Sequence, residues 1–255
     1  DAFMGLPGQV ANIQLTFLLD NSRAALDNTN WPAYAECPAG SSKFCYEKAA
    51  LRETVTGLKG RSLSAGLMLF SGTGKEGPDR SGAYVRSALK SMSGAGYADL
   101  LTRLDALTIT ADVAATPGYA LALHEAYLYH QGLTARSGTQ ATADPAAFDL
   151  MPRYRKPLPA CGRSYLVVIS NGTPDSGEDG LAQSLLTGLG GRLADDPLYF
   201  TPTDLRPNWA DEYARWLAGT SLVTHVIEVA PQSSPEGRAR SSWLASIAQA
   251  GRGQY

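Results

Sequence analysis

The chain alternates between short apolar stretches of strand length and longer stretches with helical periodicity. Five stretches rich in apolar residues predict strands, at residues 13–19, 66–70, 83–89, 164–170 and 222–229. Helical patterns lie between and after them, at residues 46–58, 97–107, 117–129, 181–189, 209–217 and 239–250. This alternation is typical of a parallel sheet covered by helices. The sequence therefore predicts a doubly wound α/β fold, with a mostly parallel central sheet and helices on both faces.

Two stretches have no periodicity and are expected to be surface inserts, at about residues 29–45 and 132–160. We see no internal repeat and no interdomain linker, so a single domain spanning residues 1–255 is expected. The closing residues Gly251–Tyr255 resemble the start of another strand. We therefore expect the chain to be a segment of a longer protein.

Composition and net charge limit the classes of partner that are expected. Apolar residues make up 44% of the chain, which is enough for a sizeable core, and the formal net charge is −2. Nucleic-acid binding needs a basic face, so nucleic acid is not an expected partner. No apolar run approaches the roughly 20 residues that span a bilayer, so no membrane span is expected in this segment.

The chain has three cysteines. Cys37 and Cys45 lie eight apart in a loop rich in Pro, Gly and Ser, and a disulfide between them would restrain that loop. In an extracytoplasmic compartment such a bond contributes about 2–3 kcal/mol. The alternative is a pair of free thiols in a reducing compartment. Cys161 is left over, either buried or paired with a cysteine outside this chain.

Candidate chemistry lies in the loops that follow the strands. In a doubly wound sheet, ligands bind beyond the carboxyl ends of the strands. Three loops are placed to meet there, and each carries polar side chains. Their residues are Asp20-Asn-Ser22-Arg-Ala24, Ala114-Ala-Thr116-Pro117 and Ser170-Asn171-Gly172.

These loops resemble those of von Willebrand factor A domains. That family carries Asp-x-Ser-x-Ser after the first strand, Thr-Pro at the start of a later helix and Asp-Gly after the fourth strand, and together they form a metal-ion-dependent adhesion site. The matching residues here, in the same order, are Asp20-x-Ser22-x-Ala24, Thr116-Pro117 and Asn171-Gly172. The resemblance implies a metal ligand set of Asp20, Ser22, Thr116 and Asn171.

Three departures weaken this metal site. Ala24 replaces a hydroxyl ligand, Asn171 replaces a carboxylate, and Arg23 adds a cation, so Asp20 is the motif's only anion. Mg²⁺ requires near-octahedral oxygen ligands, and carboxylate charge strengthens its binding. We therefore expect a degenerate site without a resident cofactor, with weak Mg²⁺ or Ca²⁺ binding as the alternative. We also hypothesise that Arg23 pairs with Asp20 in place of the metal.

A narrower resemblance is to the PilY/PilC-type proteins of type IV pili. The segment Thr203-Asp-Leu-Arg-Pro207 looks like one found at that place in the family, and the Pro159-x-Cys161 and Ala250–Tyr255 segments are also similar. The resemblance implies an extracellular protein at the pilus tip, with roles in adhesion, pilus assembly or surface sensing. The implied partners are minor pilins, other tip proteins, or a host or abiotic surface.

Two alternatives remain open. One is an extracellular receptor domain with a functional Mg²⁺ or Ca²⁺ site. The other is a secreted hydrolase, which would require a nucleophile beside a base, although none of the three loops contains histidine. His124 and His130 are spaced six apart, not four, and therefore do not form the zinc-protease helix motif. A surface or core-edge position is expected for both.

Overall fold

The central sheet is built from the five apolar stretches. The computed structural model describes residues 13–71, 81–108, 111–114, 117–157, 162–170, 172, 176–192 and 208–255. Its strands are β1 (Ile13–Leu19), β2 (Leu63–Ser71), β3 (Gly82–Ser91), β6 (Ser164–Ser170) and β7 (Leu222–Glu228). They are ordered β3-β2-β1-β6-β7. The pairs β1–β2, β1–β6 and β6–β7 are parallel and β2–β3 is antiparallel, so the predicted mostly parallel sheet is confirmed.

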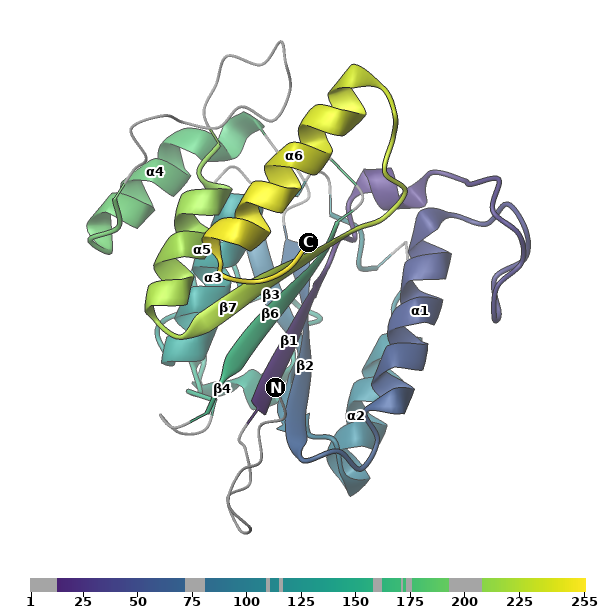
Figure 1. The fold of residues 1–255 in the computed structure, drawn as a ribbon. Coiled ribbons are helices and arrows are strands. Elements are labelled where there is room, and N and C mark those ends of the chain that lie inside the picture. Colours follow the sequence, from purple (N-terminus) through teal and green to yellow (C-terminus); the bar gives the residue numbers. More distant parts are fainter. Residues whose placement is uncertain are drawn as a thin grey trace, which may run out of the picture.

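Helices cover both faces of this sheet (Figure 1). They are α1 (Lys43–Gly57), α2 (Gly94–Asp105), α3 (Tyr119–Gln131), α4 (Asp179–Gly188), α5 (Ala210–Gly219) and α6 (Pro235–Ala250). Helices α1 and α2 lie on one side of the sheet, and α3, α4 and α5 lie on the other. Among the described residues, no helix is long and apolar enough to cross a membrane.

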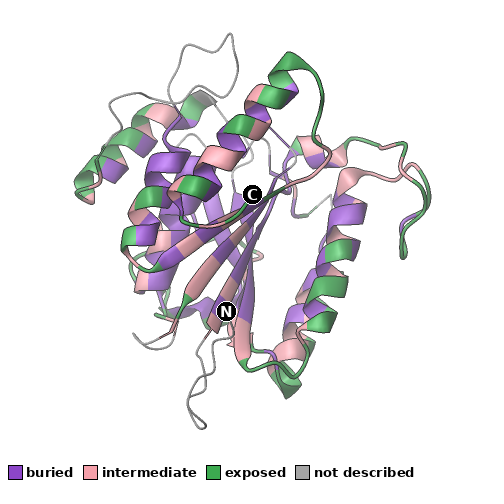
Figure 2. Ribbon diagram, viewed as in Figure 1, coloured by how far each residue is buried: buried purple, intermediate pink, exposed green. Residues whose placement is uncertain are grey.

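The core follows the centre of the sheet. Leu18 and Leu19 on β1 and Met68 and Leu69 on β2 are fully buried. Figure 2 shows that burial is concentrated in the strands and the inward faces of the helices. Central strands of a sheet covered on both sides are buried on both faces, which explains why these stretches are almost continuously apolar.

Several element boundaries differ from the sequence-based expectation by a few residues. Helix α6 begins at Pro235 rather than at residue 239, because Ser234 caps it by accepting a hydrogen bond from Gly237 N at 3.1 Å. The closing residues pair with β7, as their strand-like pattern suggests. Val226 N donates to Gln254 O at 3.0 Å, and Arg252 forms a parallel bridge with Thr224.

The first insert is a loop closed by a disulfide. Cys37 and Cys45 are bonded with an S–S distance of 2.04 Å. The loop packs on α1, where Trp31 lies edge-to-face against Tyr46, with ring centroids 5.1 Å apart. The small cluster of Cys37, Tyr46 and Ala49 is buried separately from the main core.

The second expected insert, at residues 132–160, is described at residues 132–157, and part of it also contributes to the core. This segment forms a small hairpin, β4 (Phe148–Leu150) and β5 (Arg153–Tyr154), and sends side chains into the core. Tyr154 is completely buried and stacks on Phe148. Its hydroxyl donates to the buried carboxylate of Glu125 at 2.7 Å, and Glu125 also accepts from the backbone N–H groups of residues 136–138. A buried carboxylate therefore holds the segment in place.

The expected surface or core-edge position of the two histidines is wrong. His124 and His130 are both buried in α3, with 5% and 8% of their surface exposed. Burial lowers the pKa of each imidazole to about 4. Thr16 Oγ1 lies 3.0 Å from His130 Nε2, so this ring is satisfied inside the core.

Candidate binding site at the carboxyl edge of the sheet

The loop after β1 is fixed by its own polar groups. Asp20 and Ser22 are 0% and 1% exposed, and Ser22 N donates to Asp20 Oδ1 at 2.9 Å. Asn21 Nδ2 donates to Phe70 O at 3.0 Å and Phe70 N donates to Asn21 Oδ1 at 2.8 Å. Ala114 N donates to Asn21 O. The loop is therefore tied to the end of β2 and to the segment 111–114.

The loop after β6 lies directly against this first loop. A methyl group added at Gly172 would lie 3.2 Å from Ala24 Cβ and 3.4 Å from both Asp20 Oδ2 and Ser22 Oγ. Such contacts are tight, so the close approach of the two loops favours glycine at this position. We call Asp20, Asn21, Ser22, Ala24 and Gly172 the rim. The rim brings together two loops that are about 150 residues apart in the sequence.

Tyr119, at the start of α3, is a rim contact that sequence reasoning missed. Its hydroxyl donates to Asp20 Oδ2 at 3.1 Å and also contacts Ser170 Oγ. Burial, followed by the charge of Asp20, raises the pKa of Tyr119 well above its ordinary value, so the hydroxyl stays protonated and can donate. Its ring lies edge-to-face against Phe70 and Trp243. The only local signal was a tyrosine two residues after Pro117.

Glu178 positions the beginning of α3 beside the rim. Its side chain is buried, Oε2 accepts from Leu121 N at 3.1 Å, and Oε1 accepts from Asn208 Nδ2 at 3.2 Å. Burial raises the pKa of this carboxyl to about 8, although the hydrogen bonds that it accepts oppose the rise. A carboxyl at a helix N-terminus satisfies N–H groups that have no partner within the helix. Glu178 therefore anchors the turn that carries Tyr119.

One buried polar atom of the rim is unsatisfied. Ser22 Oγ is buried and has no hydrogen-bond partner in the part of the chain that the structure describes. Arg23, its neighbour, is exposed, and no ion pair joins Arg23 to Asp20 within the described ranges. The described structure therefore gives no support to the hypothesis that Arg23 replaces the metal.

Two of the four predicted metal ligands lie among the described residues. Thr116 and Asn171 lie outside the described residues, which leaves Asp20 and Ser22 of the predicted ligands. Asp20 is the rim's only carboxylate, and it already accepts hydrogen bonds from Tyr119 and Ser22. No group of three or more His, Cys, Asp or Glu that could hold a metal exists among the described residues. By themselves, Asp20 and Ser22 would supply only part of the octahedral oxygen set that Mg²⁺ requires.

The histidines offer no base to the rim. His130 bonds to Thr16, His225 Nδ1 accepts from Gln254 N at 3.0 Å, and His124 lies 3.5 Å from the Tyr213 hydroxyl. These are all three histidines of the chain. A Ser22 hydroxyl without an adjacent base is a weak nucleophile, so this arrangement gives the hydrolase alternative no support.

Comparison with known proteins shows which solved structures share this fold. No protein-family model matches the sequence, and no curated protein matches it. Among solved structures, BatB from Bacteroides thetaiotaomicron aligns over 96% of this chain and 89% of its own, with 13% identity and a TM-score of 0.52. The PilB minor pilin from Streptococcus sanguinis aligns over 98% of this chain and 57% of its own, with 15% identity and a TM-score of 0.51.

A third similar structure is proximal thread matrix protein 1 from the mussel byssus, which has a zinc-occupied metal-ion-dependent adhesion site motif. It aligns over 96% of this chain and 41% of its own, with 14% identity and a TM-score of 0.50. The protein therefore has an α/β fold of the von Willebrand factor A-like type. In this fold the rim occupies the carboxyl edge of the sheet, where β1 and β6 lie side by side. At these identities the likeness concerns the fold alone.

Proposed function

We propose that this A domain is a non-enzymatic binding module of a type IV pilus tip protein, and that it holds its ligand at the rim without a metal ion. The observation that carries the proposal is the buried, unpartnered Ser22 hydroxyl at the point where the two loops meet. An unsatisfied buried polar group costs about 1–3 kcal/mol, and a ligand that hydrogen-bonds to Ser22 would recover this cost. Because Ser22 is only 1% exposed, binding includes a local opening of the rim.

Several features support the pilus context. The sequence resembles PilY/PilC-type proteins at residues 203–207, which lie outside the described residues. A minor pilin is among the proteins that share the fold. The disulfide fits an oxidising, extracytoplasmic location. Adhesion, pilus assembly and surface sensing all require recognition of another macromolecule, and the proposed partners are minor pilins, other tip proteins or a surface ligand.

A binding experiment tests the rim. The purified domain would be titrated against immobilised minor pilins from the same organism by biolayer interferometry. Gly172→Val places a side chain against Asp20, Ser22 and Ala24, so we expect at least a tenfold loss of affinity, or about 1.4 kcal/mol. Gly180→Val is the matched control, because a side chain at Gly180 has nothing within 4 Å. Equal affinity of the Gly172 variant and the wild type would contradict the proposal.

A second experiment separates this proposal from the metal-dependent alternative. A ligand that binds only the folded state raises the melting temperature, so we expect millimolar Mg²⁺ to leave that of the wild type unchanged. The double variant Ala24→Ser, Asn171→Asp restores the missing hydroxyl and carboxylate of the motif and should gain a Mg²⁺-dependent rise. A rise of similar size in the wild type would favour the metal-dependent receptor.

A further inference from the structure

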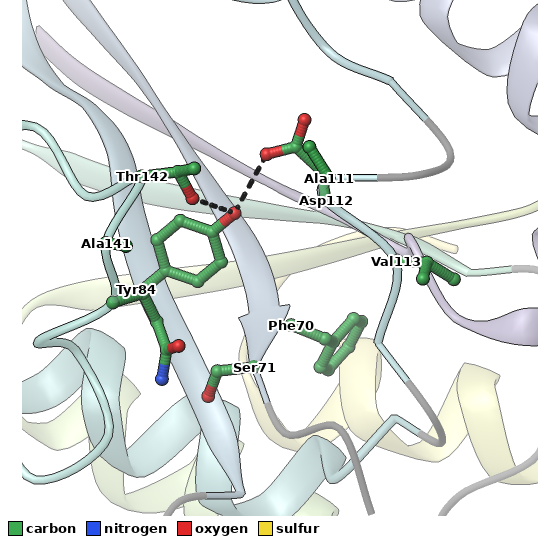
Figure 3. Close-up of a pocket in the computed structure, with 9 residues that line it drawn as sticks. Phe70, Ser71, Tyr84, Ala111, Asp112, Val113, Ala141 and Thr142 are labelled. Carbon is green, nitrogen blue, oxygen red and sulfur yellow. Dashed lines mark hydrogen bonds between the residues drawn. The ribbon is translucent and has the colours of Figure 1, made fainter.

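A cavity lies beside the rim, at the outer part of the same sheet edge. It has a volume of about 130 Å³ and lies between the end of β2, the start of β3, and the segments 111–113 and 140–142. Figure 3 shows the Tyr84 hydroxyl between Thr142 and Asp112, with the Phe70 ring on the neighbouring wall. A cavity of about 150 Å³ can hold a benzene molecule, so this one can hold a single side chain.

The hydrogen bonds in the cavity leave mostly acceptors free. Thr142 Oγ1 donates to the Tyr84 hydroxyl at 3.1 Å, and Tyr84 donates in turn to Asp112 Oδ1 at 3.2 Å. Both hydroxyl hydrogens are therefore used, whereas a hydroxyl oxygen has two lone pairs. Gln140 Nε2 donates to Ser137 O, which leaves its carbonyl oxygen as an acceptor. A ligand that fits this wall must donate hydrogen bonds.

The charge of the cavity also favours a cationic donor. The Asp112 carboxylate is 1% exposed, and Arg86 Nε lies 3.3 Å from Oδ1. Asp112 Oδ2 accepts one bond, from Thr108 N at 3.0 Å, which leaves this oxygen able to accept another. The rings of Phe70 and Tyr84 line the same space, and aromatic faces attract cations. A ligand ammonium would share the carboxylate with Arg86.

We propose that this cavity is a second binding subsite, which takes the alkylammonium side chain of a lysine presented by the partner. The aliphatic stem lies against Phe70, and the ammonium donates to Thr142 and Asp112. The aromatic rings and hydrogen-bond acceptors that line the cavity specify this chemistry, and the proposal does not depend on the pilus context.

The subsite is connected to the rim through one side chain. Asn21, a rim residue, donates from Nδ2 to both Phe70 O and Asp112 O, which belong to residues that line the cavity. A ligand bound in the cavity would therefore change the environment of Asn21 and Ser22. This connection allows one partner to engage both places at the same sheet edge.

The test uses n-butylammonium chloride as the probe and n-butanol as its neutral counterpart, followed by NMR of the ¹⁵N-labelled domain. We expect n-butylammonium to shift the amide signals of Phe70, Asp112 and Asn21 with a millimolar Kd, and n-butanol to bind at least tenfold more weakly. Thr142→Val removes the acceptor oxygen while keeping the shape, and it should weaken butylammonium binding at least fivefold.

Thr102→Val is the matched control, because Thr102 is exposed on α2 and its side-chain hydroxyl donates to Ala98 O within the same helix. It should bind butylammonium as the wild type does. The proposal is overturned if butanol binds as tightly as butylammonium, if Thr142→Val leaves a folded domain with unchanged affinity, or if the shifts map away from this cavity. A lysine-containing peptide should compete with butylammonium, whereas its Nε-acetylated form should not.

Discussion

Glu212 carries the clearest electrostatic cost in the described structure. It lies in the first turn of α5 and is 2% exposed, and both of its carboxylate oxygens are buried without a hydrogen-bond partner in the described residues. Its neighbour Asp211 is also buried, and Arg215 lies 3.9 Å from Asp211 Oδ2. Burial, followed by the effect of the neighbouring Asp211 carboxyl, raises the pKa of Glu212 from 4.5 to about 8. Ionised Glu212 therefore destabilises the folded domain.

The direction of the pH effect follows from linkage. Below about pH 4.5 both folded and unfolded states hold the proton, so the ionisation of Glu212 contributes no cost there. As the pH rises through 4.5 toward 8, the unfolded chain loses its proton while the folded domain keeps it, so stability is lost. At about 1.4 kcal/mol per pKa unit, the difference between the folded and unfolded pKa values limits the loss of stability to at most about 5 kcal/mol above pH 8. We expect a loss of stability of about 2–3 kcal/mol in practice, because the folded domain can relax around the ionised Glu212 and Asp211 side chains.

Glu212→Gln keeps the size of the side chain but cannot ionise. We expect the variant to be more stable than the wild type by about 2–3 kcal/mol near pH 9, and by less than about 1 kcal/mol near pH 5. Urea denaturation followed by tryptophan fluorescence at about pH 5, 7 and 9 measures the difference. Glu236→Gln is the control, since Glu236 also lies in the first turn of a helix but is exposed. A stability difference that does not grow with pH would refute the reasoning.

Three further predictions concern other parts of the fold. Replacing Cys37 and Cys45 together by serine should lower the free energy of unfolding by about 2–3 kcal/mol, because the closed loop is short, and unchanged urea midpoints would contradict this. Tyr154→Phe removes one donor to the buried Glu125 carboxylate and should cost about 1–3 kcal/mol in the same assay, with a smaller loss indicating that water replaces the hydroxyl. Arg23→Gln should change stability by no more than about 0.5 kcal/mol, because Arg23 is exposed. A larger loss would support an ion pair with the rim carboxylate.

Local sequence patterns were enough to predict the five central strands, the six helices and the polar loop after β1 that contributes to the rim. The strand at residues 164–170 is found with the predicted bounds, because its apolar run is long enough to be buried in any sheet. Asp20 and Ser22 were located correctly at a strand end, since a polar loop after a buried strand is a local pattern. The predicted start of α6 was four residues too late, although Ser234 followed by Pro235 is a signal for the start of a helix.

Tertiary structure alone decided which groups these residues contact. Tyr119 reaches Asp20 across 99 positions, and Tyr84 reaches Thr142 across 58. The segment after α3 is held by Glu125, although its sequence has no periodicity. Hydrophobic periodicity depends only on residues that are close in the sequence. It indicates which face of its own helix or strand a residue occupies. The partner of a buried hydroxyl or carboxylate is instead set by how the elements pack, because a buried polar group can bond only to what lies beside it in space.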